Sequence, residues 1–230
     1  MPMRPPPALP TADDAPEPRY SLSPPGEFGI GKHFMGREIS EVMGWRAKDW
    51  LDREERESEE RTDLLLPLLG VQPGMVVADI GAGTGYLARR IAPLLRPAGR
   101  VLAVEVQPML VRVLERLATE AGLDNIEASR CREDHVGLPP ASVDVAVMLD
   151  VYHELSCPYE MLASVVQAVR PGGRVVFVEF KGEDPEIPIK ALHKMTETRV
   201  RQEAALHRLE WESTASELPW QHVLVFRRAG

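Results

Sequence analysis

The sequence predicts an α/β fold: a mostly parallel, doubly wound sheet of seven strands that ends in an antiparallel hairpin. Three observations support this fold. From Leu64 onward, short β-rich runs alternate with helical stretches, which is typical of a parallel sheet covered by helices. A glycine-rich loop over residues 81–85 joins the first of these strands to a helix. The last two β-rich runs are only four residues apart, too few for a crossover between parallel strands, so they must form a hairpin.

Residues 64–230 are therefore expected to form the main domain. The run 143–149 is almost wholly apolar, as expected of a strand buried on both faces. The predicted strands are residues 75–80, 101–106, 125–129, 143–149, 174–180, 210–217 and 222–227. The predicted helices are residues 85–95, 108–121, 159–169 and 196–209.

Two segments precede this domain. Residues 1–25 are crowded with proline and carry few large apolar side chains, which predicts a disordered tail. Residues 26–63 are predicted to form an N-terminal helical cap, because apolar residues such as Ile39, Val42 and Leu51 recur at about helical spacing. The charged run over residues 52–61 is expected to be a solvated helix face.

Composition excludes several classes of protein. The 230 residues include 27 basic and 35 acidic side chains, and the net charge of −8 has the wrong sign for binding a phosphate backbone, so we expect no nucleic-acid partner. No run approaches the roughly 18 apolar residues of a membrane helix, and the start lacks the apolar region of a signal peptide. With only Cys131 and Cys157, a disulfide framework is excluded as well. These features predict a cytoplasmic protein with no membrane partner.

The glycine loop is the strongest functional signal. The apolar strand that ends at Ile80 opens through Gly81, Gly83 and Gly85 into a helix, and glycines let a ligand approach the backbone beside free helical N–H groups. Twenty residues beyond Gly85, at the end of the next strand, Glu105 stands where an acid accepts hydrogen bonds from two ribose hydroxyls. The two features together predict a site for a nucleotide-like molecule.

The glycine spacing argues against a dinucleotide as the bound molecule. A dinucleotide fingerprint would place its third glycine at position 86, where this sequence has Tyr86. A nicotinamide-dependent oxidoreductase is therefore the second hypothesis. A third is a regulatory protein that binds the cofactor without catalysis.

The sequence resembles the class I S-adenosylmethionine-dependent methyltransferases, whose fold is Rossmann-like. An acid followed by G-x-G-x-G matches the family's first motif, and the turn 171–173 (Pro-Gly-Gly) matches the one before its fifth strand. The resemblance covers about residues 64–228. It implies that Asp79 and the three glycines surround the methionine part of S-adenosylmethionine. It also implies that Glu105 holds the ribose and that Asp134 lies near the adenine amine.

The residues after the strand 143–149 should face the transferred methyl group, because ligands of open α/β sheets lie at the carboxyl ends of the strands. We predict that Asp150 contacts the cofactor. Tyr152, His153 and Glu154 offer a phenol, an imidazole and a carboxylate, and we predict that they orient or deprotonate the methyl acceptor. A histidine here can equally serve only to hold a neighbouring loop.

The acceptor is expected to be a small molecule. The Asp-Pro-Pro-aromatic motif of nucleic-acid amine methyltransferases is absent, and Tyr-His-Glu after the fourth strand looks more like enzymes that act on small molecules, quinone-pathway carbon methyltransferases among them. Asp150 and Glu179 occupy positions where catechol-type enzymes bind a divalent metal, but two carboxylates are too few, so no metal site is predicted. The acceptor atom and the oligomeric state are left open.

Overall fold

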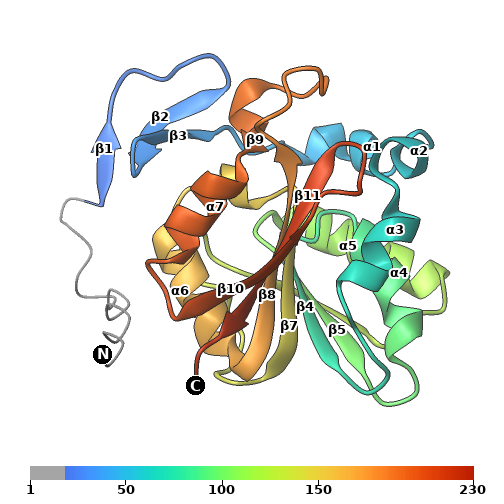
Figure 1. Ribbon diagram of the computed structural model, residues 1–230. Helices are drawn as coiled ribbons and strands as arrows, with labels where there is room; N and C mark the ends of the chain where they lie inside the picture. Colours follow the sequence, from blue (N-terminus) through green and yellow to red (C-terminus); the bar gives the residue numbers. More distant parts are fainter. Residues whose placement is uncertain (1–18) are drawn as a thin grey trace, which may run out of the picture.

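The computed structural model describes residues 19–230, whose main sheet has the strand order β10-β11-β8-β7-β4-β5-β6 (Figure 1). The strands β11 and β10 are antiparallel to their neighbours, and the other pairs are parallel. This confirms the predicted fold, to which a short strand, β9, is added beside β8. The strands are β4 (Val76–Ile80), β5 (Arg100–Glu105), β6 (Ile126–Arg130), β7 (Val143–Leu149), β8 (Val169–Lys181), β9 (Lys194–Met195), β10 (Leu209–Ala215) and β11 (Gln221–Arg228).

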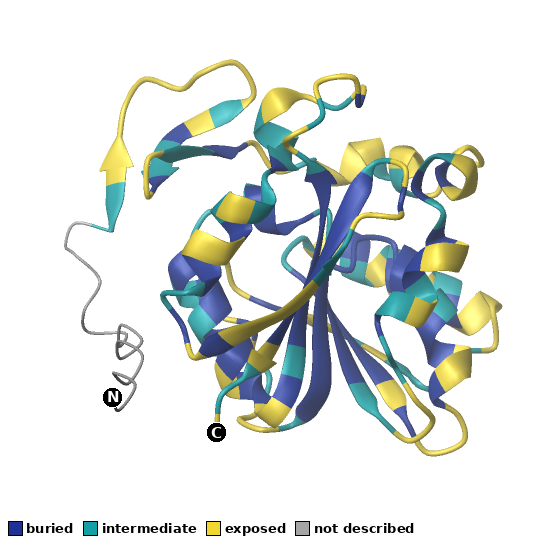
Figure 2. Cartoon of the chain, viewed as in Figure 1, coloured by how far each residue is buried: buried dark blue, intermediate teal, exposed yellow. Residues whose placement is uncertain are grey.

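Helices cover both faces of the sheet, so its central strands are buried (Figures 1 and 2). Successive residues of a strand point to opposite faces, and β4 accordingly contributes Val77 to one core and Ala78 to the other. One face packs against α3 (Thr62–Leu68), α4 (Tyr86–Ile91) with the 3₁₀ turn η3 (Ala92–Leu95), and α5 (Pro108–Glu120). The other packs against α6 (Pro158–Ala168) and α7 (Glu197–Ala204).

The strand order reverses at β4, which pairs with β5 on one side and with β7 on the other. Crossovers on the two sides of such a strand leave to opposite faces, which opens a crevice at the carboxyl ends of β4 and β7. The glycine loop and the segment that begins at Asp150 leave the sheet at this point. The fold therefore places the two predicted functional segments beside each other.

The N-terminal segment differs from the predicted helical cap. Residues 20–40 form a three-stranded antiparallel sheet, β1 (Tyr20–Leu22), β2 (Gly29–Phe34) and β3 (Arg37–Ser40). Met35 and Gly36 both have positive φ, 49° and 83°, which is the geometry of a two-residue hairpin turn between β2 and β3. Helical turns begin only with η2 (Trp45–Ala47), α1 (Lys48–Leu51) and α2 (Arg56–Glu60). The prediction of helix was thus wrong for residues 29–40.

Most of the predicted proline-rich tail, residues 1–18, lies outside the described residues, and its residues 20–22 belong to β1. Within residues 19–230, every helix is too short or too polar to cross a lipid bilayer.

Candidate active site

A cavity of about 1050 Å³ lies at the carboxyl ends of β5, β4, β7 and β8. It is lined by the glycine loop, Glu105, most residues of the segment 150–156 after β7, and residues of the loop after β8. Residues of the segment 41–60, among them Met43, Trp50 and Leu51, complete its wall. The sheet thus supplies the floor of the cavity, and the N-terminal segment supplies part of its wall.

The glycine loop is closely packed at Gly81 and has a single close neighbour at Gly83. At Gly81, with φ of 69°, a Cβ atom would lie 2.3 Å from Cγ2 of Val151 in the segment after β7. At Gly83, with φ of 55°, a Cβ atom would meet only Cδ1 of Leu51, at 2.9 Å. Positive φ also disfavours residues that carry a Cβ. The loop therefore holds its backbone at the wall of the cavity, where a ligand can reach it.

Glu105 is connected to the glycine loop directly. Its carboxylate accepts hydrogen bonds from the backbone N–H of Gly83 at 2.9 Å and of Gln107 at 2.8 Å. Burial raises the pKa of this carboxyl group, while the two N–H donors oppose the rise. The structure thus brings together the loop and the acid that the sequence singled out, and a carboxylate oxygen can accept further hydrogen bonds.

Three buried oxygens that line the cavity have no hydrogen-bond partner among the described residues: Asp79 Oδ2, Thr84 Oγ1 and Asp150 Oδ1. Burial raises the pKa of Asp79 to about 7, and it also raises that of Asp150. Buried acceptors of this kind are normally satisfied, by the protein, by water or by a ligand. They fit a ligand that brings hydroxyl and ammonium donors, as S-adenosylmethionine does.

The structure does not bring Asp134 to the cavity. Its carboxylate is partly exposed and forms two hydrogen bonds with the guanidinium of Arg132, at 2.8 and 2.7 Å. Arginine matches a carboxylate with this paired geometry, which holds Asp134 at the surface. Glu133, the preceding residue, lines the cavity instead.

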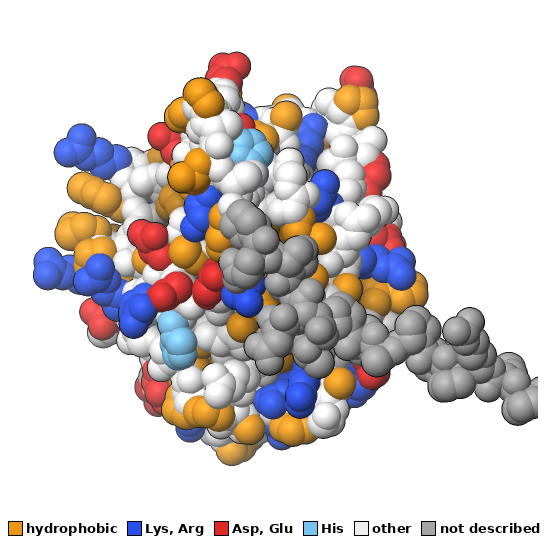
Figure 3. Space-filling view, turned by 90° about the vertical axis from the view of Figure 1, so that its left-hand side faces the viewer, with side chains coloured by type: hydrophobic (Ala, Val, Ile, Leu, Met, Phe, Trp, Pro, Cys, Tyr) orange, Lys and Arg blue, Asp and Glu red, His pale blue; other side chains and the backbone are white. Residues whose placement is uncertain are grey.

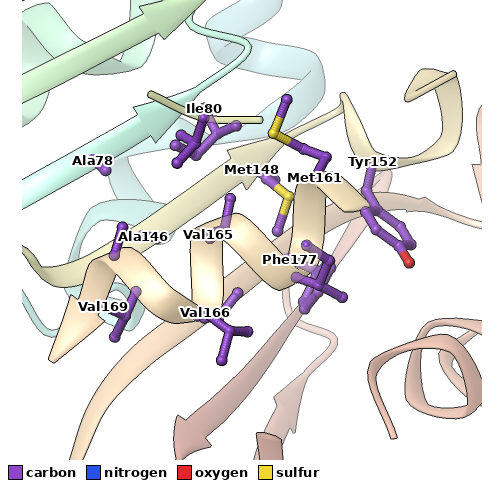
Figure 4. Close-up of a cluster of buried hydrophobic side chains, with 14 of the residues drawn as sticks. Ala78, Ile80, Ala146, Met148, Tyr152, Met161, Val165, Val166, Val169 and Phe177 are labelled. Atoms are coloured by element: carbon purple, nitrogen blue, oxygen red, sulfur yellow. The ribbon is translucent and has the colours of Figure 1, made fainter. Parts of the chain in front are cut away.

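Tyr152 was predicted to face the acceptor, and this prediction is wrong. Its side chain is fully buried and belongs to the core between the sheet and α6 (Figure 4). The ring packs edge-on against Phe177, with 4.9 Å between the ring centroids. Burial and the carboxylate of Glu203 raise the pKa of Tyr152. Tyr152 is therefore a packing residue.

His153 and Glu154 do line the cavity, and each is held by a partner. His153 Nδ1 lies 2.6 Å from Oε2 of Glu179, and Nε2 lies 3.2 Å from Nδ1 of His193. Glu154 accepts a hydrogen bond from the backbone N–H of Met43 at 3.2 Å. Both ring nitrogens of His153 are thus engaged, so it does not present a free nitrogen to an acceptor.

Sequence reasoning missed His193, which lines the cavity from the 3₁₀ turn η5 (Ala191–His193) between β8 and β9. Burial and the neighbouring His153 lower the pKa of His193 to about 4, and burial raises the pKa of Glu154 to about 7. The position of His193, after the carboxyl end of a central strand, was the signal that could have identified this residue from the sequence.

Arg56 is a second residue that was missed. The sequence predicts that residues 52–61 are solvated, but Arg56 and Glu60 are buried and paired at 2.8 Å. Arg56 Nη2 also lies 3.7 Å from Oδ2 of Asp150. An isolated charge is costly to bury, so the charge of Arg56 is balanced by the carboxylates of Glu60 and Asp150 beside the cavity.

Comparisons with known proteins agree with this geometry. Residues 78–175 match the family model described as a methyltransferase domain. A ubiquinone/menaquinone biosynthesis C-methyltransferase of Ectopseudomonas mendocina is 28% identical over 116 residues, 50% of this chain and 45% of that protein. A tRNA U34 carboxymethyltransferase of Desulfotalea psychrophila is 29% identical over 186 residues, 75% of this chain and 57% of that protein. The chain thus spans less than two thirds of the length of these relatives.

Among solved structures, a SAM-dependent methyltransferase from Aquifex aeolicus superposes with a TM-score of 0.77 at 21% identity, over 82% of this chain and all of that one. This likeness concerns the fold. The family match over residues 78–175, the relatives and the glycine loop beside Glu105 support, with this fold, a class I S-adenosylmethionine-dependent methyltransferase.

Proposed function

We propose that this protein transfers a methyl group from S-adenosylmethionine to a small-molecule acceptor. One observation carries the proposal: a single cavity contains both the glycine loop with Glu105 and the group formed by His153, Glu154 and His193. These residues follow four adjacent strands, which at about 4.8 Å between strands extend over roughly 14 Å. Cofactor and acceptor can therefore lie side by side along the edge of the sheet.

Each part of the cavity has a role in this proposal. Asp79 and the glycine loop would surround the methionine part, with Asp79 binding its ammonium group, and Glu105 would hold the ribose. S-adenosylmethionine supplies an electrophilic methyl group on a sulfonium. The protein has to hold the acceptor in line with that methyl group and to exclude water. The cap residues Trp50 and Leu51 provide an apolar wall for this purpose.

A small acceptor is favoured over a nucleic acid by charge. The chain has a net charge of −8, which disfavours binding to the negatively charged phosphate backbone of a nucleic acid. In Figure 3, acidic and basic side chains are interspersed on the visible face, so basic groups do not form a continuous track there. The relative from Ectopseudomonas mendocina is named as a quinone-pathway C-methyltransferase, which supports a small acceptor. The predicted cytoplasmic location is part of the same proposal and agrees with the free thiols of Cys131 and Cys157.

The proposal is tested with S-adenosylmethionine carrying a labelled methyl group. The protein is incubated with the small-molecule fraction and, separately, with the RNA fraction of a cell extract. We expect label and S-adenosylhomocysteine to appear only with the small molecules. Label in the RNA fraction would contradict the acceptor class. Tight cofactor binding with no S-adenosylhomocysteine formed from any fraction would identify a binding protein without catalysis.

Replacing Glu105 by alanine should weaken cofactor binding. Hydrogen bonds to a charged group contribute about 1.5–3 kcal/mol, so the dissociation constant for S-adenosylhomocysteine should rise roughly 10- to 150-fold. Calorimetric titration measures this change. Glu127→Ala, which removes an exposed acid from neighbouring β6, is the control and should leave the affinity unchanged. Wild-type affinity in a folded Glu105→Ala protein would show that this acid does not hold the ribose.

Asp79→Asn should change how stability depends on pH. In the unfolded chain an aspartate has a pKa near 3.9, whereas burial raises the pKa of Asp79 to about 7. Between these values the folded protein retains a proton that the unfolded chain has lost, so the free energy of unfolding falls as pH rises from about 4 to about 7. Below this window both states are protonated, and above it the loss is complete.

Asparagine does not titrate, so the variant should lose less stability between pH 5 and pH 8 and should melt above the wild type at pH 8. Thermal unfolding of the ligand-free proteins at both pH values measures this. The charged groups that act on Asp79 are Arg56 and Glu105, and both remain in the variant. At pH 8 the same variant should bind S-adenosylmethionine more weakly, because the carboxylate that faces the ammonium group is gone. Identical pH dependence in the two proteins would refute the buried, protonated state of Asp79.

A further inference from the structure

We propose that His153, Glu154 and His193 form a binding site for a divalent first-row transition-metal ion. The sequence predicted no metal, because its only candidate ligands were the two carboxylates of Asp150 and Glu179, and His193 comes from a distant loop. The three side chains offer two imidazole nitrogens and a carboxylate oxygen, all within 4.8 Å of one another. All three residues line the cavity.

The distance between the two imidazoles fits a shared ion. His153 Nε2 and His193 Nδ1 are 3.2 Å apart, and the two rings meet at 69°. Two nitrogens that each lie about 2.1 Å from one metal are about 3.0 Å apart in octahedral geometry and about 3.4 Å apart in tetrahedral geometry. The observed separation falls between these values. Little movement is needed for both rings to bind one ion.

A carboxylate orients the first of these histidines. Glu179 lies 2.6 Å from His153 Nδ1 and is itself fixed by the backbone N–H of Tyr152 at 2.8 Å. Glu179 is fully buried. With Nδ1–H donating to this carboxylate, the lone pair of His153 Nε2 is left facing His193. Histidines that bind metals commonly have this carboxylate partner, which fixes the tautomer and makes the nitrogen more basic.

The donor set selects the type of ion. Two imidazoles and one carboxylate suit Zn²⁺, Fe²⁺ or Co²⁺, whereas Mg²⁺ and Ca²⁺ prefer oxygen donors. Three protein ligands leave further coordination positions, and the cavity gives a small molecule access to them. A hydroxyl, thiol or carboxylate of the methyl acceptor would bind there. This role rests on the proposed function, whereas binding of the ion does not.

The test uses Co²⁺ as a spectroscopic probe on the full chain after removal of metal by a chelator. We expect one equivalent of Co²⁺ to give visible absorption bands, Zn²⁺ to displace it, and a large excess of Mg²⁺ to have no effect. His193→Ala and Glu154→Gln should each weaken Co²⁺ binding by at least tenfold. Glu179→Gln, which acts only through His153, should weaken it by about 10- to 100-fold. Thermal unfolding verifies that each variant is folded.

His135→Ala is the matched control, because His135 is exposed and lies outside this cluster. It should retain wild-type Co²⁺ affinity and stoichiometry. The proposal is overturned if Co²⁺ gives no bands with the wild type, or if the His193 and Glu154 variants bind like it. In that case Glu179, His153 and His193 form only a hydrogen-bonded chain. S-adenosylhomocysteine is titrated into the metal-free protein in parallel, so that a failure of the metal site and a failure of the proposed function give different results.

Discussion

Gly83→Val is expected to raise the dissociation constant for S-adenosylhomocysteine at least a hundredfold while the protein remains folded. The only atom that a new Cβ would approach closely is Cδ1 of Leu51 in the cap, at 2.9 Å, and that side chain can move. The valine would therefore be accommodated by the fold but would occupy the space where the ligand approaches the backbone. Calorimetric titration measures the affinity, and Gly83→Ala should give a smaller loss.

A matched control separates blocking from backbone strain. Gly122, in the turn between α5 and β6, has a φ of 65°, close to the 55° of Gly83, and a Cβ there would meet nothing within 4 Å. Gly122→Val should thus suffer comparable strain and lose stability, but should keep its affinity for S-adenosylhomocysteine. Equal affinity in the Gly83 and Gly122 variants would remove the glycine loop from the binding site.

Arg37→Ala should lower the free energy of unfolding by about 3–5 kcal/mol, because it leaves a buried carboxylate without its partner. Arg37, in β3, donates two hydrogen bonds to Glu203 of α7, at 2.8 and 2.9 Å, and Glu203 is fully buried. Arg37 also donates to the carbonyl of His153 at 3.1 Å. The same side chain therefore attaches the N-terminal sheet to the main domain and positions the segment after β7. Chemical denaturation measures the loss.

Two further variants show whether the unpaired carboxylate causes this loss. Arg199→Ala removes an exposed guanidinium of α7 that bonds to the carbonyl of Met35, and it should cost less than about 1 kcal/mol. The double variant Arg37→Met, Glu203→Met removes both charges and should be more stable than Arg37→Ala alone. A double variant that is less stable than Arg37→Ala would contradict this explanation.

The main domain could be predicted from the sequence because its pattern is local. Each central strand is a short apolar run, and the run 143–149 coincides with β7. The hairpin of β2 and β3 could not be predicted in this way. Its turn places Met35 at positive φ, a position where glycine or asparagine is expected, and Ile39 fits both a helical and a strand pattern.

Some residues of the candidate site could likewise be predicted from the sequence, and others could not. The glycine loop and Glu105 follow directly from the ends of adjacent parallel strands, so their proximity was predictable. Tyr152 and His153 are neighbours in the chain, and the path of one short turn decides which side chain enters the core and which lines the cavity. Asp134 depends on Arg132 beside it, and His193 pairs with a residue 40 positions away. The contact of His193 depends on tertiary structure, and that of Asp134 depends on the path of the loop after β6; a single sequence specifies neither.

The central claim is that the glycine loop and Glu105 hold S-adenosylmethionine with its reacting end toward His153, Glu154 and His193. A crystal structure of the complex with S-adenosylhomocysteine tests this most directly. We expect both ribose hydroxyls within hydrogen-bond distance of the Glu105 carboxylate, and the sulfur facing the part of the cavity that contains Glu154 and His193. A ligand bound outside this cavity, or one whose sulfur faces away from those side chains, would contradict the claim.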